Sequence, residues 1–146
     1  MTRKYLSDAG IKIDSTIDPL SASPHDSRCA QWREEIDTYG FASCELWNLD
    51  KTMLYMLYER LRMWQEYGLS GEEDNLVIEG EHLVIEGVHL AIEGKDASLE
   101  QWVDDMVQMC QEIFDNDKDV FASEESAYLS QKVWRIWSEV SPLMWI

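Results

Sequence analysis

Apolar residues recur at steps of three and four in four stretches of the chain, and each stretch predicts an amphipathic helix. The first helix is expected to start at a cap formed by Asp26 or Ser27 and to end at Gly40. Within it, Cys29, Trp32, Arg33 and Ile36 fall near helical spacing. The second has the strongest helical pattern and is expected between a cap at Asn48 and a stop at Gly68. Its inward positions are Leu49, Met53, Met56, Leu57, Leu61 and Trp64.

Two more helices are predicted in the C-terminal third. Ser98 and Gln101 have the spacing of a capping box, in which each side chain accepts a backbone N–H of the first turn. The stripe that follows is Trp102, Met106, Met109 or Cys110, and Ile113. A last helix is expected between Ser123 and Pro142, with Leu129, Val133, Trp134, Ile136, Trp137 and Val140 facing inward. Residues 1–24 are polar and contain two prolines, so they are predicted to form an irregular arm.

The stretch LVIEGEHLVIEGVHLAIEG, residues 76–94, repeats with a period of seven residues. A coiled coil is excluded because Leu and Ile lie two apart and because a Gly in each copy disfavours a helix. We expect three short antiparallel strands, NLVIE, HLVIE and HLAIE, joined by two-residue turns at Gly80-Glu81 and Gly87-Val88. The predicted fold is therefore mainly α (α+β). It is one compact four-helix domain over residues 1–146, with a three-stranded β-meander inserted at residues 72–96 between the second and third helices.

The expected register of the meander brings histidines next to carboxylates. Glu79 would lie opposite His82, Glu86 opposite His89, and His82 opposite Glu93 on the next ladder. Imidazole and carboxylate groups at that spacing could hold Zn²⁺. Cross-strand charge pairing is the favoured interpretation, because only two histidines are present and short strands hold ligands loosely. The near-identical copies also indicate a recent tandem duplication, which would give a scaffold or a tolerated insertion.

Charge sets this chain apart from an ordinary globular protein. Its 146 residues include 29 acidic and 12 basic ones, for a formal net charge of −17. That excess argues against direct nucleic-acid binding through a basic surface and favours basic protein partners or cations. Residues 72–125 hold 17 of the acidic residues but only Lys95 and Lys118 among the basic ones, an excess of 17 − 2 = 15 negative charges.

Nine of these acidic residues lie on or beside the third predicted helix and its exit loop. They are Glu100, Asp104, Asp105, Glu112, Asp115, Asp117, Asp119, Glu124 and Glu125. Carboxylates repeated along one helical face could resemble a phosphate backbone and compete for the basic groove of a nucleic-acid-binding protein. A solvated acidic surface without a partner is the simpler interpretation.

The sequence does not support calcium binding, and it contains no catalytic or nucleotide-binding motif. The run DNDKD at residues 115–119 lacks the glycine of a calcium loop, because Val120 stands there. No hydrolase, metalloprotease, P-loop or dinucleotide-binding motif is present. Three cysteines without a CxxC pair indicate free thiols in a reducing compartment, and no apolar run is long enough to span a membrane. We expect a non-enzymatic protein without a cofactor, located in the cytoplasm of a host cell.

The segment GFASCELWNLDKTMLYMLYERLRMWQE resembles a recurring segment of small uncharacterised proteins encoded by bacteriophages and prophages. The matching residues are Gly40, Phe41, Glu45, Trp47, Leu49, Asp50, Thr52, Arg60 and Leu61. Trp102, Asp105 and Met106 resemble the family's W-x-x-x-[LV]-D-x-M helix with an offset, and residues 134–146 resemble its aromatic tail. The resemblance covers residues 40–68 and 98–146, but neither the N-terminal arm nor the triplicated segment. It implies a phage context and supplies no mechanism.

The leading hypothesis is a phage accessory protein that binds and modulates a host protein. Its sharper form is an anti-defence protein, such as an anti-CRISPR protein, whose acidic face mimics nucleic acid in the basic groove of its partner. The alternative is an oligomeric structural or assembly protein, with a homodimer surface near Trp134, Trp137 and Trp145. A second alternative is a small-molecule or metal-binding protein that uses the His/Glu strands.

Overall fold

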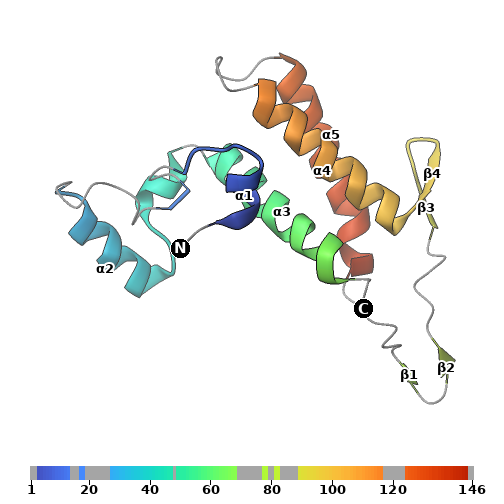
Figure 1. The fold of residues 1–146 in the computed structure, drawn as a ribbon, viewed down its shortest axis with the longest axis horizontal. Helices are drawn as coiled ribbons and strands as arrows, with labels where there is room; N and C mark the ends of the chain where they lie inside the picture. Colours follow the sequence, from blue (N-terminus) through green and yellow to red (C-terminus); the bar gives the residue numbers. More distant parts are fainter. Residues whose placement is uncertain are drawn as a thin grey trace. The chain divides into compact units, whose positions relative to one another are not determined.

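The chain is mainly helical in a computed structural model, which describes residues 3–13, 17–18, 27–47, 49–68, 77–78, 81–82, 89–116 and 124–144 (Figure 1). The α-helices are α1 (Lys4–Asp8), α2 (Cys29–Tyr39), α3 (Leu49–Met63), α4 (Leu99–Asn116) and α5 (Glu124–Val140). Short helical turns are η2 (Ser43–Leu46), the π-helical η3 (Trp64–Gly68) and η5 (Ser141–Met144). The strands are β1 (Val77–Ile78), β2 (Glu81–His82), β3 (His89–Ile92) and β4 (Lys95–Ser98).

Contacts within the chain define an N-terminal unit, Met1–Glu59, and a C-terminal unit, Arg60–Ile146. The four helices predicted from periodicity are confirmed as α2, α3, α4 and α5. Among the described residues, no helix combines the length and apolar character needed to cross a bilayer. The expectation of one domain stays a prediction.

The N-terminal arm is not wholly irregular, because it contains α1. This helix buries Tyr5 and Leu6. Arg3 holds it in place: its Nη1 donates to the Ile17 carbonyl oxygen at 2.9 Å, and its guanidinium forms an ion pair with Glu59 of α3. Apolar side chains and a long-range ion pair therefore order a segment whose composition predicted no helix.

The core of α2 forms around Trp32, which is 2% exposed and packs with Ala42 and Cys44. The helix ends at Gly40, as predicted, where a φ of 87° lets the glycine N–H reach the Ile36 carbonyl oxygen at 2.8 Å. Its N-cap is Arg28, without a side-chain cap bond, and not Ser27. The other predicted cap, Asp26, lies outside the described residues.

The buried face of α3 matches the predicted one only in part: Leu57 and Leu61 are buried as predicted, and Met56 and Trp64 are half-buried. Leu49 and Met53 are 49% and 43% exposed, although they were expected to face inward. The buried positions are Thr52, Leu54, Leu57, Tyr58 and Leu61. This helix carries two overlapping apolar stripes, and the periodicity gives no reason to choose between them. The large burial of Tyr58, at 2% exposure, goes with the second stripe.

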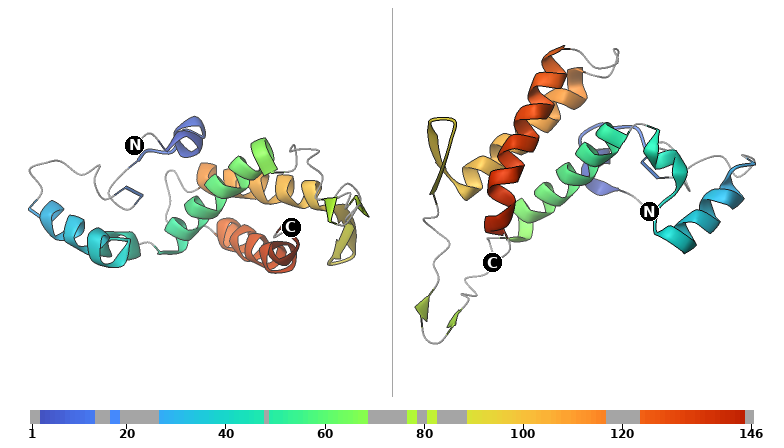
Figure 2. Two further views of the ribbon diagram at one scale, coloured as in Figure 1. Left: turned by 90° about the horizontal axis from the view of Figure 1, so that it is seen from below. Right: turned by 180° about the vertical axis from the view of Figure 1, so that it is seen from behind.

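In the C-terminal unit, α4 and α5 run side by side over most of their length (Figures 1 and 2). The predicted capping box at the start of α4 is confirmed. The Ser98 N–H donates to Gln101 Oε1 at 2.9 Å, and the Gln101 N–H donates to Ser98 Oγ at 3.2 Å. The predicted inward residues of α4 are buried except Met109, which is half-buried. Of those on α5, Val133, Ile136 and Val140 are buried and the others are half-buried.

Over the described residues, the strands between α3 and α4 form two two-stranded hairpins, β1–β2 and β3–β4. Most of the predicted second strand, residues 83–86, lies outside the described residues, so the three-stranded meander stays a prediction. Val77 pairs with His82 and Ile78 with Glu81, so the first turn lies one residue before the predicted Gly80-Glu81. In the second hairpin His89 pairs with Ser98 and Ile92 with Lys95. The second strand of this hairpin, β4 with the sequence KDAS, was not predicted, because it has only one apolar residue. The predicted turn Gly87-Val88 lies outside the described residues.

The β3–β4 hairpin turns at Glu93-Gly94, where both residues have positive φ values of 51° and 83°. Two-residue loops with positive φ at both positions are the type I′ turns that match the twist of hairpin strands. The positive φ at the second position of this turn therefore favours glycine there. The two predicted turns, Gly80-Glu81 and Gly87-Val88, have their glycine at the first position, whereas the turn at Glu93-Gly94 has it at the second.

We expect Gly94→Ala to lower the free energy of unfolding by about 1 kcal/mol, because an L-residue is strained at that positive φ. No atom lies within 4 Å of the position of an added Cβ, so the cost is conformational and not steric. Urea denaturation measures it. Gly94→Asn is the control and should recover part of the loss, since Asn tolerates the left-handed region. Equal losses for Ala and Asn would contradict a type I′ turn.

Burial raises the pKa of the Cys110 thiol to about 12. The unfolded thiol ionises near pH 8.5, so the stability that the neutral buried thiol contributes is complete below that pH. It is then lost as the pH rises toward 12. We expect unfolding free energy to fall by about 1 kcal/mol per unit above pH 9 through this group. Urea denaturation of the wild type and Cys110→Ala between pH 8 and 10 measures the difference in slope. Parallel slopes would contradict burial of this thiol.

Candidate functional site

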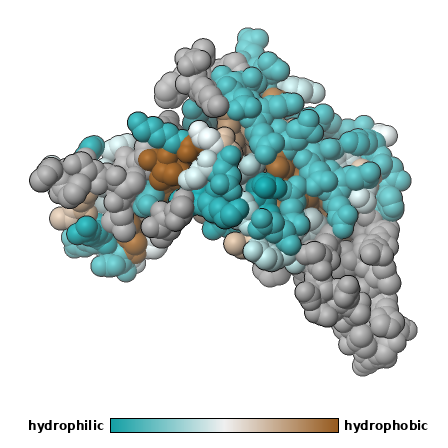
Figure 3. Space-filling model, viewed as in Figure 1, coloured by the Kyte–Doolittle hydropathy of each residue, from teal (hydrophilic) through white to brown (hydrophobic). Residues whose placement is uncertain are grey.

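The outer face of α4 combines carboxylate and amide side chains and carries no basic residue. Its exposed positions are Glu100, Gln101, Asp104, Gln108, Gln111, Glu112, Asp115 and Asn116. The whole helix, LEQWVDDMVQMCQEIFDN, has no Lys or Arg. Hydrophilic residues cover most of the visible surface of the α4–α5 pair (Figure 3). The predicted acidic face is therefore exposed where the structure describes it, except at Asp105, which is half-buried.

The opposite face of α4 fixes the orientation of these carboxylates. Its buried residues are Leu99, Trp102, Val103, Met106, Val107, Cys110, Ile113 and Phe114. A helix that buries one stripe in this way cannot rotate without exposing it, and each large side chain contributes about 1.5–3 kcal/mol. The charged face is thus held on a rigid element and presented in one direction.

Asp104 and Asp105 of the predicted acidic face contact side chains of other elements in the unit. Gln65 Nε2 of η3 donates to Asp104 Oδ1 at 2.7 Å. Lys95 Nζ of β4 contacts Asp105 Oδ2 at 2.6 Å. The ammonium neutralises the Asp105 charge locally, so Asp105 contributes less to an outward negative field than its position in the sequence indicates.

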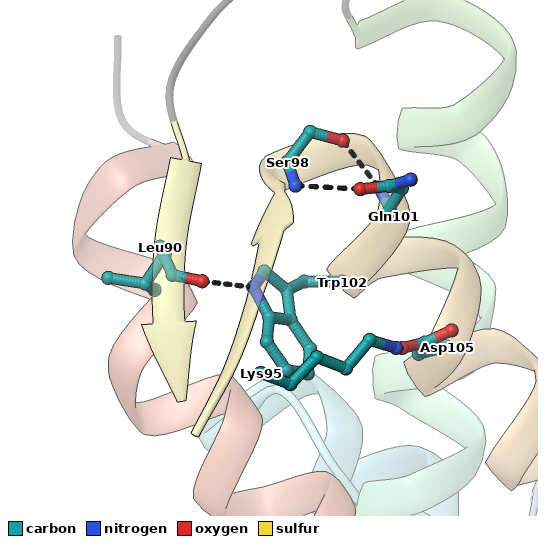
Figure 4. A network of polar contacts seen from close by, with 6 residues as sticks. All are labelled: Leu90, Lys95, Ser98, Gln101, Trp102 and Asp105. Carbon is teal, nitrogen blue, oxygen red and sulfur yellow. Dashed lines mark hydrogen bonds and ion pairs between the residues drawn. The ribbon is translucent and has the colours of Figure 1, made fainter. Parts of the chain in front are cut away.

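The Lys95–Asp105 pair belongs to a network that joins the β3–β4 hairpin to α4 (Figure 4). The indole Nε1–H of Trp102 donates to the Leu90 carbonyl oxygen at 2.8 Å. Lys95 Nζ also lies 5.1 Å from the centroid of the Trp102 ring, in the geometry of a cation–π contact. The capping box at Ser98 and Gln101 lies at the same end of the helix. The hairpin therefore anchors the first turns of α4.

The start of α5 extends the acidic surface of the unit. Glu124 and Glu125 are exposed in its first turn, where the helix dipole favours negative charge. Asp117 and Asp119, which were predicted to continue the face between α4 and α5, lie outside the described residues. The described exposed carboxylates are thus Glu100, Asp104, Glu112 and Asp115 on α4, with the two glutamates of α5.

The structure does not bring the predicted metal ligands together in the expected pairs. His82 lies opposite Val77, not Glu79. Glu93 belongs to the β3–β4 turn, and its Oε1 lies 2.7 Å from Arg135 Nη1, so it does not pair with His82 across a ladder. His89 is exposed opposite Ser98. Glu79 and Glu86 lie outside the described residues. Over the described ranges, no group of three His, Cys, Asp or Glu side chains could hold a metal ion.

Three partners of the acidic residues were not found from the sequence, namely Gln65, Lys95 and Arg135. All three contacts join different segments of the chain. Gln65 is 39 positions away from Asp104, which no local spacing rule reaches. Lys95 offered the only signal, because it is one of two basic residues in the acidic span and it precedes the helix directly.

In comparisons with known proteins, no protein family, no curated protein and no solved structure matches this chain.

We expect Trp102→Phe to lower the free energy of unfolding by about 1–3 kcal/mol, because the Leu90 carbonyl loses its donor and the core loses part of a ring. Trp102 is 3% exposed, so water cannot readily replace the indole N–H. Trp47→Phe is the control, since that ring is 54% exposed and should change stability much less. Urea denaturation followed by circular dichroism compares them. Equal effects would show that the indole bond does not anchor the hairpin.

Proposed function

We propose that this protein binds a host nucleic-acid-handling protein and inhibits or modulates it, with the outer face of α4 and the first turn of α5 taking the place of nucleic acid. The observation that carries this proposal is the orientation of α4. Its apolar stripe is fully buried, and its outward side presents only carboxylates and amides.

The charge distribution supports a basic partner. The C-terminal unit holds 19 acidic and 6 basic residues, a net charge of −13, whereas the N-terminal unit holds 10 and 6, a net charge of −4. A field of that sign attracts basic surfaces over about 10 Å at moderate salt and raises the rate of association with them. Nucleic acid itself would be repelled by the same field.

The face also has the chemistry that a nucleic-acid groove recognises. Such grooves use Arg and Lys to bind phosphate oxygens, and carboxylate oxygens accept the same hydrogen bonds. Interspersed amides such as Gln108 and Gln111 can donate and accept, like the edges of bases. Because α4 has a rise of about 1.5 Å per residue, its acidic positions extend over more than four helical turns.

The resemblance to uncharacterised phage and prophage proteins adds a phage context to this proposal and no mechanism. It implies that the partner is bacterial. An anti-defence protein, such as an anti-CRISPR protein, is the specific form of this proposal.

The test is capture of partners from a bacterial lysate by the immobilised full chain, with washes at low and high salt. We expect a nucleic-acid-binding protein that is released by salt and also by added duplex DNA, since both displace contacts to carboxylates. Retention of the same partner at high salt, or in excess DNA, would contradict mimicry. A column that binds no nucleic-acid-binding protein would contradict the proposal as a whole.

For the captured partner, we expect the double variant Glu100→Gln/Glu112→Gln to weaken binding about tenfold, because two exposed ion pairs contribute up to about 1 kcal/mol each. The matched control is Glu34→Gln/Asp37→Asn on α2, which removes the same charge from exposed positions of the other unit. Calorimetry or surface plasmon resonance measures both. Equal losses would assign the effect to net charge and not to the α4 face.

A further inference from the structure

The strongest feature outside the acidic face is a group of exposed apolar side chains around the connection between α2 and α3. Its members are Tyr39, Phe41, Leu46, Trp47, Leu49 and Met53, here called the α2–α3 apolar surface, and they are between 43% and 69% exposed. All six lie within 15 consecutive residues, Tyr39 to Met53. We propose that this surface is the interface of a symmetric homodimer of the full chain.

The backbone beneath this surface is held in one conformation. Glu45 Oε2 accepts the Ala42 N–H at 2.6 Å, and Glu35 Oε2 accepts the Ser43 N–H at 2.7 Å. The second bond lowers the pKa of the Glu35 carboxyl. Thr52 Oγ1 donates to the Glu45 carbonyl oxygen at 3.1 Å, which ties η2 to the first turn of α3. A connection fixed in this way loses little conformational entropy when a partner binds.

The aromatic side chains are ordered as well. The Trp47 ring meets Trp32 edge to face at a centroid distance of 6.0 Å, and the Arg28 guanidinium lies over both rings at 5.3 Å and 5.0 Å. The rings of Tyr39 and Phe41 are 6.4 Å apart. Aromatic residues, Met and Arg are the side chains enriched at the centre of protein interfaces. This surface is composed mainly of them.

The exposed area is of the size that a dimer interface requires. With about 150–250 Å² for each large side chain, half-exposure of six of them gives on the order of 600 Å² per copy. This sum over the six side chains is close to the ~800 Å² per partner of a standard interface.

Charge determines which partner fits. Residues 39–53 contain only Glu45, Asp50 and Lys51 as charged side chains, a net charge of −1, and the Glu45 carboxylate already accepts a backbone N–H. A twofold axis brings a surface against itself, so a surface with a large net charge of one sign would repel its copy. The C-terminal unit, with its net charge of −13, would repel a copy of itself, whereas this surface would not. A strongly charged partner, in turn, finds few groups here to pair with.

The experiment compares Met53→Glu with Met63→Glu in the full chain. The two methionines lie on the same helix, are 43% and 55% exposed, and receive the same added charge. Met53 belongs to the α2–α3 apolar surface and Met63 does not. Sedimentation velocity and light scattering over about 1–200 µM give the dimerisation constant, because association depends on protein concentration.

We expect the wild type and Met63→Glu to form dimers of equal affinity, and Met53→Glu to dimerise at least about tenfold more weakly, since the interface would bury an unpaired carboxylate from each copy. Higher salt should strengthen the wild-type dimer by screening repulsion between the acidic chains. Leu46→Ser, outside any α-helix, is the second variant if Met53→Glu loses helicity, and it should weaken the dimer in the same way.

A wild type that stays monomeric at every concentration would overturn the proposal, and so would equal losses in the two methionine variants. A dimer unaffected by both Met53→Glu and Leu46→Ser would also overturn it. Because the readout is self-association, its failure leaves the acidic face of α4 unaffected, and a failed capture from lysate leaves the dimer unaffected.

Discussion

Burial of one face of α4 is the constraint on which the C-terminal unit depends. The stripe from Leu99 to Phe114 removes apolar side chains from water along the whole helix. That burial sets the rotation of the helix, and the rotation decides which side chains meet solvent. The acidic face is therefore a consequence of core packing, because the carboxylates occupy the positions that the core does not use. Any function of that face therefore requires the buried stripe of α4 to remain free of charged residues.

The hairpin before α4 adds a second constraint, at the end where a helix is least stable by itself. The first turn of any helix has N–H groups without intrahelical partners, and here the capping box satisfies two donors reciprocally. The indole of Trp102 extends this fixation to the hairpin through the Leu90 carbonyl. A lysine on β4 then occupies one carboxylate of the face. The same few residues thus join the strands, cap the helix and shape the local charge.

The sequence predicted the parts of this structure that depend on local rules. The four longer helices, the Gly40 stop and the capping box all follow from spacing of up to four residues, and all are confirmed. Errors arose where a choice depended on distant partners. Periodicity could not decide between the two apolar stripes of α3, and composition could not show that Arg3 would reach Glu59 and order α1.

For the candidate site, too, local features were predicted and contacts with distant residues were not. Exposure of the acidic face followed from helical periodicity, whereas the neutralisation of Asp105 by Lys95 required the hairpin to be in place. The first hairpin turns one residue before the predicted Gly80-Glu81, so that His82 lies opposite Val77. The strand β3 pairs with β4, which the sequence did not predict, so that His89 lies opposite Ser98.

The same turn bears on how the repeat can vary in length. In both described hairpins the paired residues that close the turn, Ile78 with Glu81 and Ile92 with Lys95, flank a Glu-Gly dipeptide. The first and third copies therefore each bring their own reversal signal. Gain or loss of one whole seven-residue copy would leave Ile-Glu-Gly directly before Lys95, and so leave the cap of α4 unchanged. Replication slippage in this stretch would thus produce length variants whose helical part folds alike.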